Sequence, residues 1–208
     1  MDAITSRSQT LKKTILTLLL SLGAITAHAG ASVYALDAAA STLVASALKN
    51  ESVTVKVSFP GLGGSLDLSS GVAVVGADLK KLSTGDVARD SNIQSLFFEV
   101  AKKAVYGQAT FNWKGVPAEL KALKTGEAKA VTLSGTLTIH GSKVPLSGPA
   151  ELTLLANGNY KASLKNWKLS IQALKLGGTL ANLNKLCPQP HRVADEVLLN
   201  GELVFKKP

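Results

Sequence analysis

Cysteine is nearly absent from the 208 residues, since Cys187 is the only one. A single cysteine cannot form a disulfide within the chain, so a packed core must stabilise the fold. Two interpretations of the thiol stay open: a partly buried free cysteine before Pro188, or a cysteine that pairs with another molecule. Because Cys187 does not directly follow the apolar run near the N-terminus, it is not a lipoprotein anchor.

Histidine and the common catalytic motifs are also scarce. After residue 29 the only nitrogen or sulfur metal ligands are His140, His191 and Cys187, without close spacing, whereas a metal site needs three or four converging ligands. The chain has no G-x-S-x-G and no H-E-x-x-H motif, and "GLGGSL" at 61–66 lacks the glycine spacing of a dinucleotide loop. We therefore predict no metal site, and we predict that the protein is not an enzyme.

Long hydrophobic runs are missing except for one near the N-terminus, over residues 14–26. This run is shorter than the roughly 20 residues of a transmembrane helix. Arg7 and the Lys12-Lys13 pair precede it, and the A-x-A cleavage pattern Ala27-His28-Ala29 follows, as in a secretory signal peptide. We predict a signal peptide over 1–29, one domain over 30–208, and a location in the periplasm, or outside the cell if the host lacks an outer membrane.

Acidic residues are outnumbered by basic ones, and the formal net charge is +9. The lysines occur singly or in pairs such as Lys80-Lys81, which is typical of ordinary solvated faces. Because the protein is expected to be exported, we predict no nucleic acid partner. Transient contact with an anionic membrane surface stays open, and the composition favours no particular oligomeric state.

Alternating apolar residues fill most of the remaining chain. The stretch 53–59 alternates Val, Val, Val and Phe with polar residues until Pro60-Gly61 ends it, which predicts a half-buried strand. Asn157-Gly158 is a hairpin signal, and a change of phase near Lys165-Asn166 predicts a bulge. Six to nine such strands separated by Gly, Pro and Asn indicate an all-β antiparallel sandwich or barrel.

Three stretches depart from the strand pattern. Asp90 or Ser91 is expected to cap a short helix through residues 92–96, because its side-chain oxygen can accept from the free amides of a first turn. The segment 117–123, "PAELKAL", begins with a proline suited to a first helical position and predicts one or two helical turns. The segment 177–192 shows no periodicity, and we interpret it as a long loop.

Four segments together resemble the YceI-like family of exported bacterial proteins. They occur in the family's order and span nearly all of the chain after the predicted signal peptide. The segments are Tyr34-Ala35-Leu36-Asp37, "LSTGDVARDSNIQSLFFEV" (82–100), "GTLTIHGSKVPL" (135–146) and "VADEVLLNGELVF" (193–205). The resemblance implies a lipocalin-like antiparallel β-barrel of about eight strands with a short helix near its mouth. It also implies a long apolar channel that can hold a polyisoprenoid chain, such as an isoprenoid quinone tail.

The resemblance also guides the interpretation of His140. In the family's pattern this block leads one strand through a turn into the next, so His140-Gly141-Ser142-Lys143 would form the turn. Histidine tolerates unusual backbone angles and glycine adopts a positive φ at little cost. The chain departs from the family at Ala40-Ser41 and Asn50, where the family often carries histidine, and these positions fall where polar groups would meet a ligand's head.

The alternation and the resemblance together select candidate ligand contacts. Arg89 with Asp90 would either bind an anionic head group or bridge locally at a helix cap. Phe97 and Phe98 are adjacent, so they point in different directions, one into the core and the other to the rim or the ligand. In a barrel that holds a ligand, core and pocket wall are one surface. The candidate residues are Val55, Val57, Arg89, Phe97, Phe98, Phe111, Trp113, Leu137, Ile139 and Trp167.

These observations predict an exported carrier or sequestering protein for a long apolar ligand, with a polyprenyl or quinone-like lipid as the leading candidate and no other cofactor. One alternative is a basic cell-envelope-binding module whose barrel is filled by its own side chains. Aromatic residues make up only 5% of the chain, which suits such a narrow aliphatic interior. Another alternative is an antibiotic-binding lipocalin. The interior volume of the barrel discriminates between a carrier and a filled module.

Overall fold

The computed structural model describes residues 33–115, 118–186 and 192–208. The predicted signal peptide lies outside these residues, as do Cys187 and His191. The described strands are β1 (Val33–Leu36), β2 (Thr42–Lys49), β3 (Val53–Ser58), β4 (Leu62–Asp67), β5 (Val72–Asp78), β6 (Gln108–Lys114), β7 (Ala128–Ile139), β8 (Ser142–Leu154), β9 (Tyr160–Ser170) and β10 (Val193–Lys206). The described helices are α1 (Val87–Asn92), α2 (Gly177–Asn184), the π-helical turn η2 (Ile93–Phe97) and the 3₁₀ turns η1 (Leu79–Lys81), η3 (Ala104–Gly107) and η4 (Ala118–Ala122).

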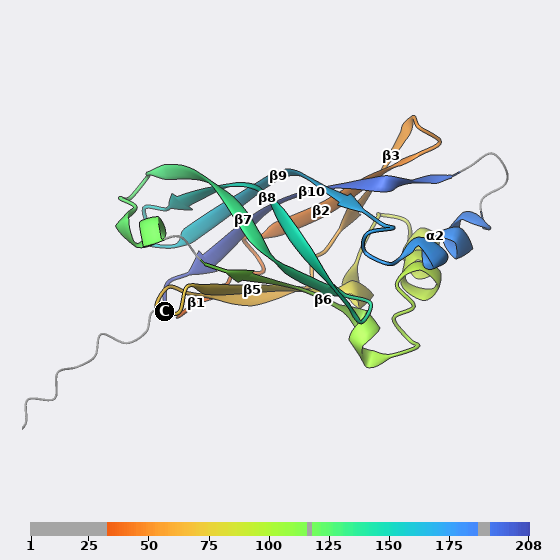
Figure 1. The fold of residues 1–208 in the computed structure, drawn as a ribbon, viewed down its shortest axis with the longest axis horizontal. Coiled ribbons are helices and arrows are strands. Elements are labelled where there is room, and N and C mark those ends of the chain that lie inside the picture. Colours follow the sequence, from red (N-terminus) through yellow and green to blue (C-terminus); the bar gives the residue numbers. More distant parts are fainter. Residues whose placement is uncertain (1–32, 116–117, 187–191) are drawn as a thin grey trace, which may run out of the picture. The chain divides into compact units, whose positions relative to one another are not determined.

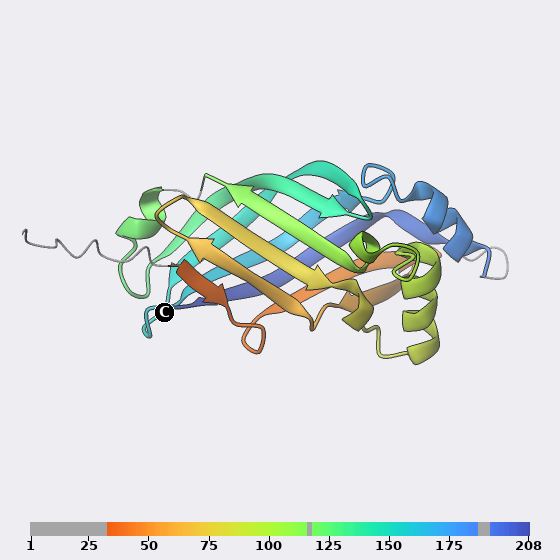
Figure 2. The same ribbon diagram turned by 90° about the horizontal axis from the view of Figure 1, so that it is seen from below.

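The strands form one antiparallel sheet that closes into a barrel (Figures 1 and 2). β1 closes the ring because it pairs with β4 on one side and with β10 on the other. β1 and β2 both run along β10 and are separated by a break at 37–41. β3 and β4 are likewise separated by a break at 59–61, and they pair with β2 and β1 respectively. Each pair therefore acts as one interrupted strand. The barrel has eight strands when each pair is counted as one, which confirms the expected lipocalin-like barrel of about eight strands.

The predicted turns and the predicted bulge are confirmed. Ile139 pairs with Ser142, so β7 and β8 are joined by the two residues His140 (φ 49°) and Gly141 (φ 74°). Two consecutive positive φ angles are the geometry of a tight hairpin whose twist matches the strands. The residues 155–159, which include Asn157-Gly158, join β8 to β9. Asn166 has a φ of 53° where the register between β9 and β10 shifts, as the change of phase predicts.

The expected cap of the first helix was wrong by four residues or more. Asp86, not Asp90 or Ser91, caps α1, and its carboxylate accepts from the Arg89 amide at 3.0 Å. The carboxylate of Asp90 accepts instead from the Thr84 backbone amide and hydroxyl, at 2.7 and 2.6 Å. The helix therefore begins at Val87, and its last turn continues into the π-helical turn η2.

The expected loop over 177–192 was wrong for its first half, which is the helix α2. Two glycines in its first turn lower its intrinsic helix propensity by about 1 kcal/mol each. The helix is stabilised instead by burial, because Leu176 and Leu180 are both less than a tenth exposed. The residues 187–191 of that stretch lie outside the described residues. The helical turn expected over 117–123 is confirmed as η4.

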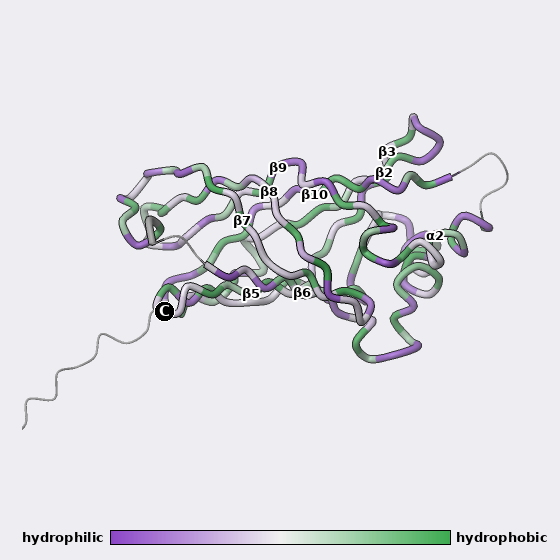
Figure 3. Tube along the Cα trace, in the orientation of Figure 1, coloured by the Kyte–Doolittle hydropathy of each residue, from purple (hydrophilic) through white to green (hydrophobic). Residues whose placement is uncertain are grey.

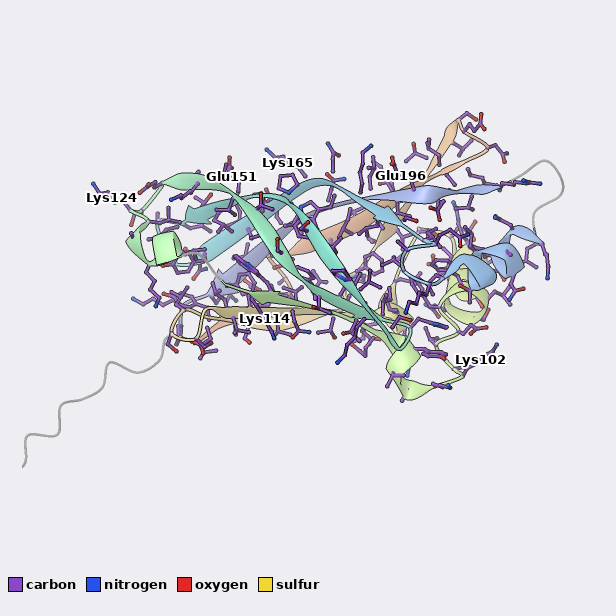
Figure 4. The ribbon with its side chains drawn as sticks, in the orientation of Figure 1. Lys102, Lys114, Lys124, Glu151, Lys165 and Glu196 are labelled. Atoms are coloured by element: carbon purple, nitrogen blue, oxygen red, sulfur yellow. The ribbon has the colours of Figure 1, made fainter. Side chains whose placement is uncertain are left out.

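The core follows the barrel interior. Figure 3 shows hydrophobic and hydrophilic residues alternating along the strands, and Figure 4 shows the labelled Glu151, Lys165 and Glu196 pointing away from the barrel. At the end opposite α2, the rings of Tyr34 and Tyr160 meet edge to face at 5.0 Å. Burial raises the pKa of Tyr160, and its hydroxyl donates to the carbonyl of Leu120 in η4 at 3.2 Å. This end of the barrel is therefore packed with side chains.

Two adjacent glycines in β4 give a stability prediction with a matched control. A Cβ at Gly64 (φ 152°) would lie 2.0 Å from the carbonyl oxygen of Val74 on β5, whereas a Cβ at Gly63 would meet nothing within 4 Å. We expect Gly64→Ala to lower the free energy of unfolding by about 2 kcal/mol or more. Gly63→Ala should change it by less than about 0.5 kcal/mol. Urea unfolding checks this, and equal effects of the two variants would contradict it.

Candidate functional site

A cavity of about 600 Å³ occupies the α2 end of the barrel interior. Its walls come from β2, β3, β5, β6, β7, β9 and β10 and from the helical segments η1, α1, η2 and α2. Leu43, Ala45 and Ala47 alternate along β2 and all face the cavity, and the last two pair with Val57 and Val55 on β3. Small side chains at Ala45 and Ala47 leave the interior open at this level. The volume of the cavity falls within the range of about 300–1,000 Å³ typical of small-molecule sites.

Seven of the ten predicted ligand contacts line this cavity. They come from three parts of the chain, which are β3, the stretch from α1 through η2 to residue 98, and β7. They are Val55, Val57, Arg89, Phe97, Phe98, Leu137 and Ile139. Phe97 and Phe98 both line the cavity although they are adjacent in the chain, and their rings meet each other edge to face at 4.7 Å.

The remaining three predicted contacts, Phe111, Trp113 and Trp167, lie deeper in the barrel. They line a second cavity of only about 90 Å³. The two cavities share wall residues from five strands, Leu43, Ala77, Ala109, Leu137 and Leu199, so they lie next to each other. Leu137 is therefore a predicted contact that lines both cavities. The interior therefore narrows from a wide aliphatic upper part to a small space among aromatic rings, which we call the aromatic floor (Phe111, Trp113 and Trp167).

Trp167 is the best-anchored member of the aromatic floor. Its indole Nε1–H donates to the carbonyl of Pro149 at 2.6 Å, and its ring meets Phe111 edge to face at 5.8 Å. A Cβ at Gly148 would lie 2.5 Å from the indole, so the ring packs directly on the backbone of β8. Trp167 is only 3% exposed. These contacts fix the ring in place across the barrel axis.

Polar side chains line the cavity only at its mouth. Four of the lining residues are polar, and they are Lys49, Asp86, Arg89 and Asn92. The Arg89 guanidinium donates to Asp86 at 3.2 Å, so the local bridge expected of Arg89 forms with Asp86 rather than Asp90. The backbone amide of Arg89, followed by its side chain, holds the pKa of Asp86 below its ordinary value. The mouth therefore carries a cationic side chain on either side, from β2 and from α1.

The α2 leucines are wall residues that the sequence interpretation missed. Leu176, Leu180 and Leu183 line the cavity, as do Leu174 just before the helix and Leu186 just after it. The spacing of Leu176, Leu180 and Leu183 is that of one helical face. This signal was present in the sequence, but the flanking glycines and prolines obscured it.

His140 has a structural role in the hairpin and lies against two residues that the sequence did not single out. Its ring stacks on Tyr106 with centroids 3.7 Å apart, and its Nε2 lies 3.2 Å from the Glu99 carboxylate. The carboxylate also accepts from Lys102 Nζ at 2.5 Å. Glu99 itself has a φ of 51°. These contacts attach the segment between η2 and η3 to the β7–β8 turn and so hold the helical side of the mouth in place.

Glu99 gives a pH-dependent stability prediction. The hydrogen bond from Lys102, aided by its charge and by His140, holds the pKa of Glu99 below its ordinary 4.5. A pKa lowered by folding adds stability above pH 4.5, and this stability is lost as the pH falls through the folded-state pKa. We expect Glu99→Gln to unfold at a lower urea concentration than the parent at pH 7. The difference should shrink on acidification, whereas the outward-pointing Glu151→Gln should show little difference at either pH.

Within 33–115, 118–186 and 192–208, no three His, Cys, Asp or Glu side chains come close enough to hold a metal ion. Among these same residues, no helix has the length and hydrophobicity needed to cross a bilayer.

A closed eight-stranded antiparallel barrel with an apolar cavity and helices at its mouth defines a lipocalin-like barrel protein. The model of the YceI-like domain matches residues 34–205. The chain therefore belongs to the YceI-like family, which confirms the resemblance of the four sequence segments.

Solved structures with this fold come from several bacteria. A polyisoprenoid binding domain from Saccharophagus degradans implicated in plant cell wall breakdown matches with a TM-score of 0.76 and 24% identity, covering 84% of this chain and 98% of that chain. BcnA from Burkholderia cenocepacia matches at 0.59 and 21%, covering 81% and 98%. The Campylobacter jejuni YceI protein matches at 0.50 and 21%, covering 74% and 86%. These identities support the fold alone, and a comparison with curated proteins finds no match.

Proposed function

We propose that this protein is exported and that it carries or sequesters a long apolar molecule, with a polyprenyl or isoprenoid quinone tail as the leading candidate. The cavity of about 600 Å³ carries the proposal, because its walls are almost entirely aliphatic and aromatic. The similar fold of the polyisoprenoid binding domain from Saccharophagus degradans supports the choice of tail. No covalent step is needed for such a function.

The size of the cavity sets how much of a tail it holds. At the ~30 Å³ that one water-sized group occupies, 600 Å³ accommodates roughly 20 carbon groups, or about four isoprene units. Burying a methylene contributes about 0.8 kcal/mol. About ten of them are enough to offset the cost of immobilisation and leave micromolar or tighter binding, near about −8 kcal/mol.

The polar mouth is suited to the head of such a molecule. Lys49 and Arg89 carry the positive charges among the cavity wall residues, and both lie on segments that frame its opening. A phosphate or quinone head would remain near these groups and near water while the tail fills the interior. At the other end, the rings of Tyr34 and Tyr160 pack against each other.

The open interior weighs against a module filled by its own side chains, since the large cavity leaves the α2 end of the barrel unfilled. An antibiotic-binding lipocalin would use the same cavity with a shorter and bulkier ligand. The predicted lack of catalysis, the export and the location in the periplasm remain parts of the proposal.

Native mass spectrometry of the chain exported into a bacterial periplasm, purified without detergent, tests the proposal. A stoichiometric added mass that extracts into organic solvent as a polyprenyl-type lipid is the expected result. A bare mass that stays bare after incubation with quinones and polyprenols would overturn it in favour of the envelope-binding module. An added mass from a compact drug-like molecule would favour the antibiotic-binding alternative.

A further inference from the structure

Exposed large apolar side chains gather around the mouth of the cavity. Leu48 is 42% exposed, Val53 54%, Val87 86% and Leu186 52%. We call these four residues the rim patch. They come from the β2–β3 hairpin, the first residue of α1 and the end of α2, and Figures 1 and 2 show the hairpin and the helices at the same end of the barrel.

Each member of the rim patch lines the cavity, neighbours a wall residue in sequence or pairs with one across a hairpin, and Leu48 faces the outside of the barrel because Lys49 faces the interior. Leu186 itself lines the cavity while half exposed. Leu48 precedes the wall residue Lys49, and Val53 pairs with Lys49 across the hairpin. Val87 lies between Asp86 and Ala88, which both line the cavity. Scattered single apolar residues on a surface are ordinary, whereas a group around one opening marks an interaction site.

Basic residues slightly outnumber acidic ones beside the rim patch. The basic residues next to it in sequence or across the hairpin are Lys49, Arg89, Lys185 and Arg192, and the acidic ones are Glu51, Asp86 and Asp90. Arg89 already pairs with Asp86. Arg192 is attached to the hairpin, since its amide donates to the Asn50 side chain at 2.8 Å and its carbonyl accepts from the Asn50 amide at 2.9 Å. The whole chain, at +9, adds long-range attraction to anionic surfaces.

We propose that the rim patch docks onto an anionic phospholipid bilayer. Apolar side chains that enter the interface, flanked by lysine and arginine, are the combination that binds anionic membranes. Docking would place the cavity mouth against the bilayer, so that an apolar tail passes between the membrane and the barrel without crossing water. The proposal of docking depends only on the exposed apolar and basic residues around the mouth, whereas the transfer of a tail rests on the function proposed above.

Vesicle co-sedimentation tests the docking. The chain without its predicted signal peptide should bind vesicles of phosphatidylcholine mixed with phosphatidylglycerol, bind pure phosphatidylcholine weakly, and lose binding as salt increases. The double variant Val53→Asp and Val87→Asp, at two rim residues that do not line the cavity, should bind the anionic vesicles at least about tenfold more weakly. Val33→Asp is the matched control, because Val33 is 45% exposed but lies on β1, near the opposite end of the barrel. Equal losses from the control, or no vesicle binding by the parent, would overturn the proposal.

A second measurement separates this proposal from the proposed function. Farnesol added from solution reaches the cavity without a membrane, so the rim variants should bind it as the parent does. Vesicle binding without farnesol binding would leave the docking intact and count against the carrier. Farnesol binding by the parent without vesicle binding would count against the docking alone.

Discussion

Replacing Ala45 with tryptophan is expected to weaken the binding of a polyprenyl or quinone tail at least about 100-fold. Ala45 lies midway along β2, lines the cavity and faces Val57 on the neighbouring strand. An indole at this position would extend into open space rather than into packed side chains. It would exclude several carbon groups of the tail, and losing three or four buried methylenes at ~0.8 kcal/mol each costs about 3 kcal/mol, or about 100-fold.

The next residue on the same strand provides the control. Side chains on a strand alternate between faces, and because Ala45 and Ala47 face the cavity, Ser46 faces outward. Ser46→Trp adds the same indole without reducing the cavity and should bind the tail as the parent does. Titration of both variants with farnesol, followed by tryptophan fluorescence or calorimetry, gives the comparison. Similar affinities for Ala45→Trp and the parent would mean that the tail does not occupy this part of the barrel.

The period-two pattern predicted which strand residues face inward, but not how far along the barrel each residue lies. Ala109, Phe111 and Trp113 share one face of β6, yet Ala109 lies on the wall of the large cavity and Trp113 on the aromatic floor. Register with the neighbouring strands decides this height, and long-range pairing sets the register. A single strand's pattern contains no such information. The seven predicted residues on the wall of the large cavity and the three deeper ones therefore looked alike in the sequence.

The helical segments show a different limit. Asp86 and Asp90 are both chemically suited to cap a helix, and the choice is made by Thr84, whose amide and hydroxyl occupy the Asp90 carboxylate. α2 was missed because local propensity opposes it, whereas its stability comes from leucines buried against other parts of the chain. Turns were predicted well because their signals are local. The hairpins at His140-Gly141 and Asn157-Gly158 need only their own backbone geometry.

The second large effect is expected from Trp167→Ala, which removes the anchored ring of the aromatic floor. The variant loses a nearly fully buried indole, its hydrogen bond to the Pro149 carbonyl and its contact with Phe111. Removing a buried tryptophan costs about 3–5 kcal/mol. Urea unfolding should show this loss, whereas Lys165→Ala, an outward-pointing residue of the same strand, should show almost none.

The same residue should also set the length of tail that the barrel accepts. In the parent, affinity for isoprenoid alcohols should rise with each isoprene unit until the large cavity is full, at about four units, and then level off at the aromatic floor. Trp167→Leu keeps an apolar side chain at the floor but enlarges the small cavity that adjoins the large one. In this variant the affinity should level off at an alcohol that is longer by about one isoprene unit. An unchanged length preference in a folded Trp167→Leu variant would mean that the tail stops above the floor, and Trp167 would then act in stability alone.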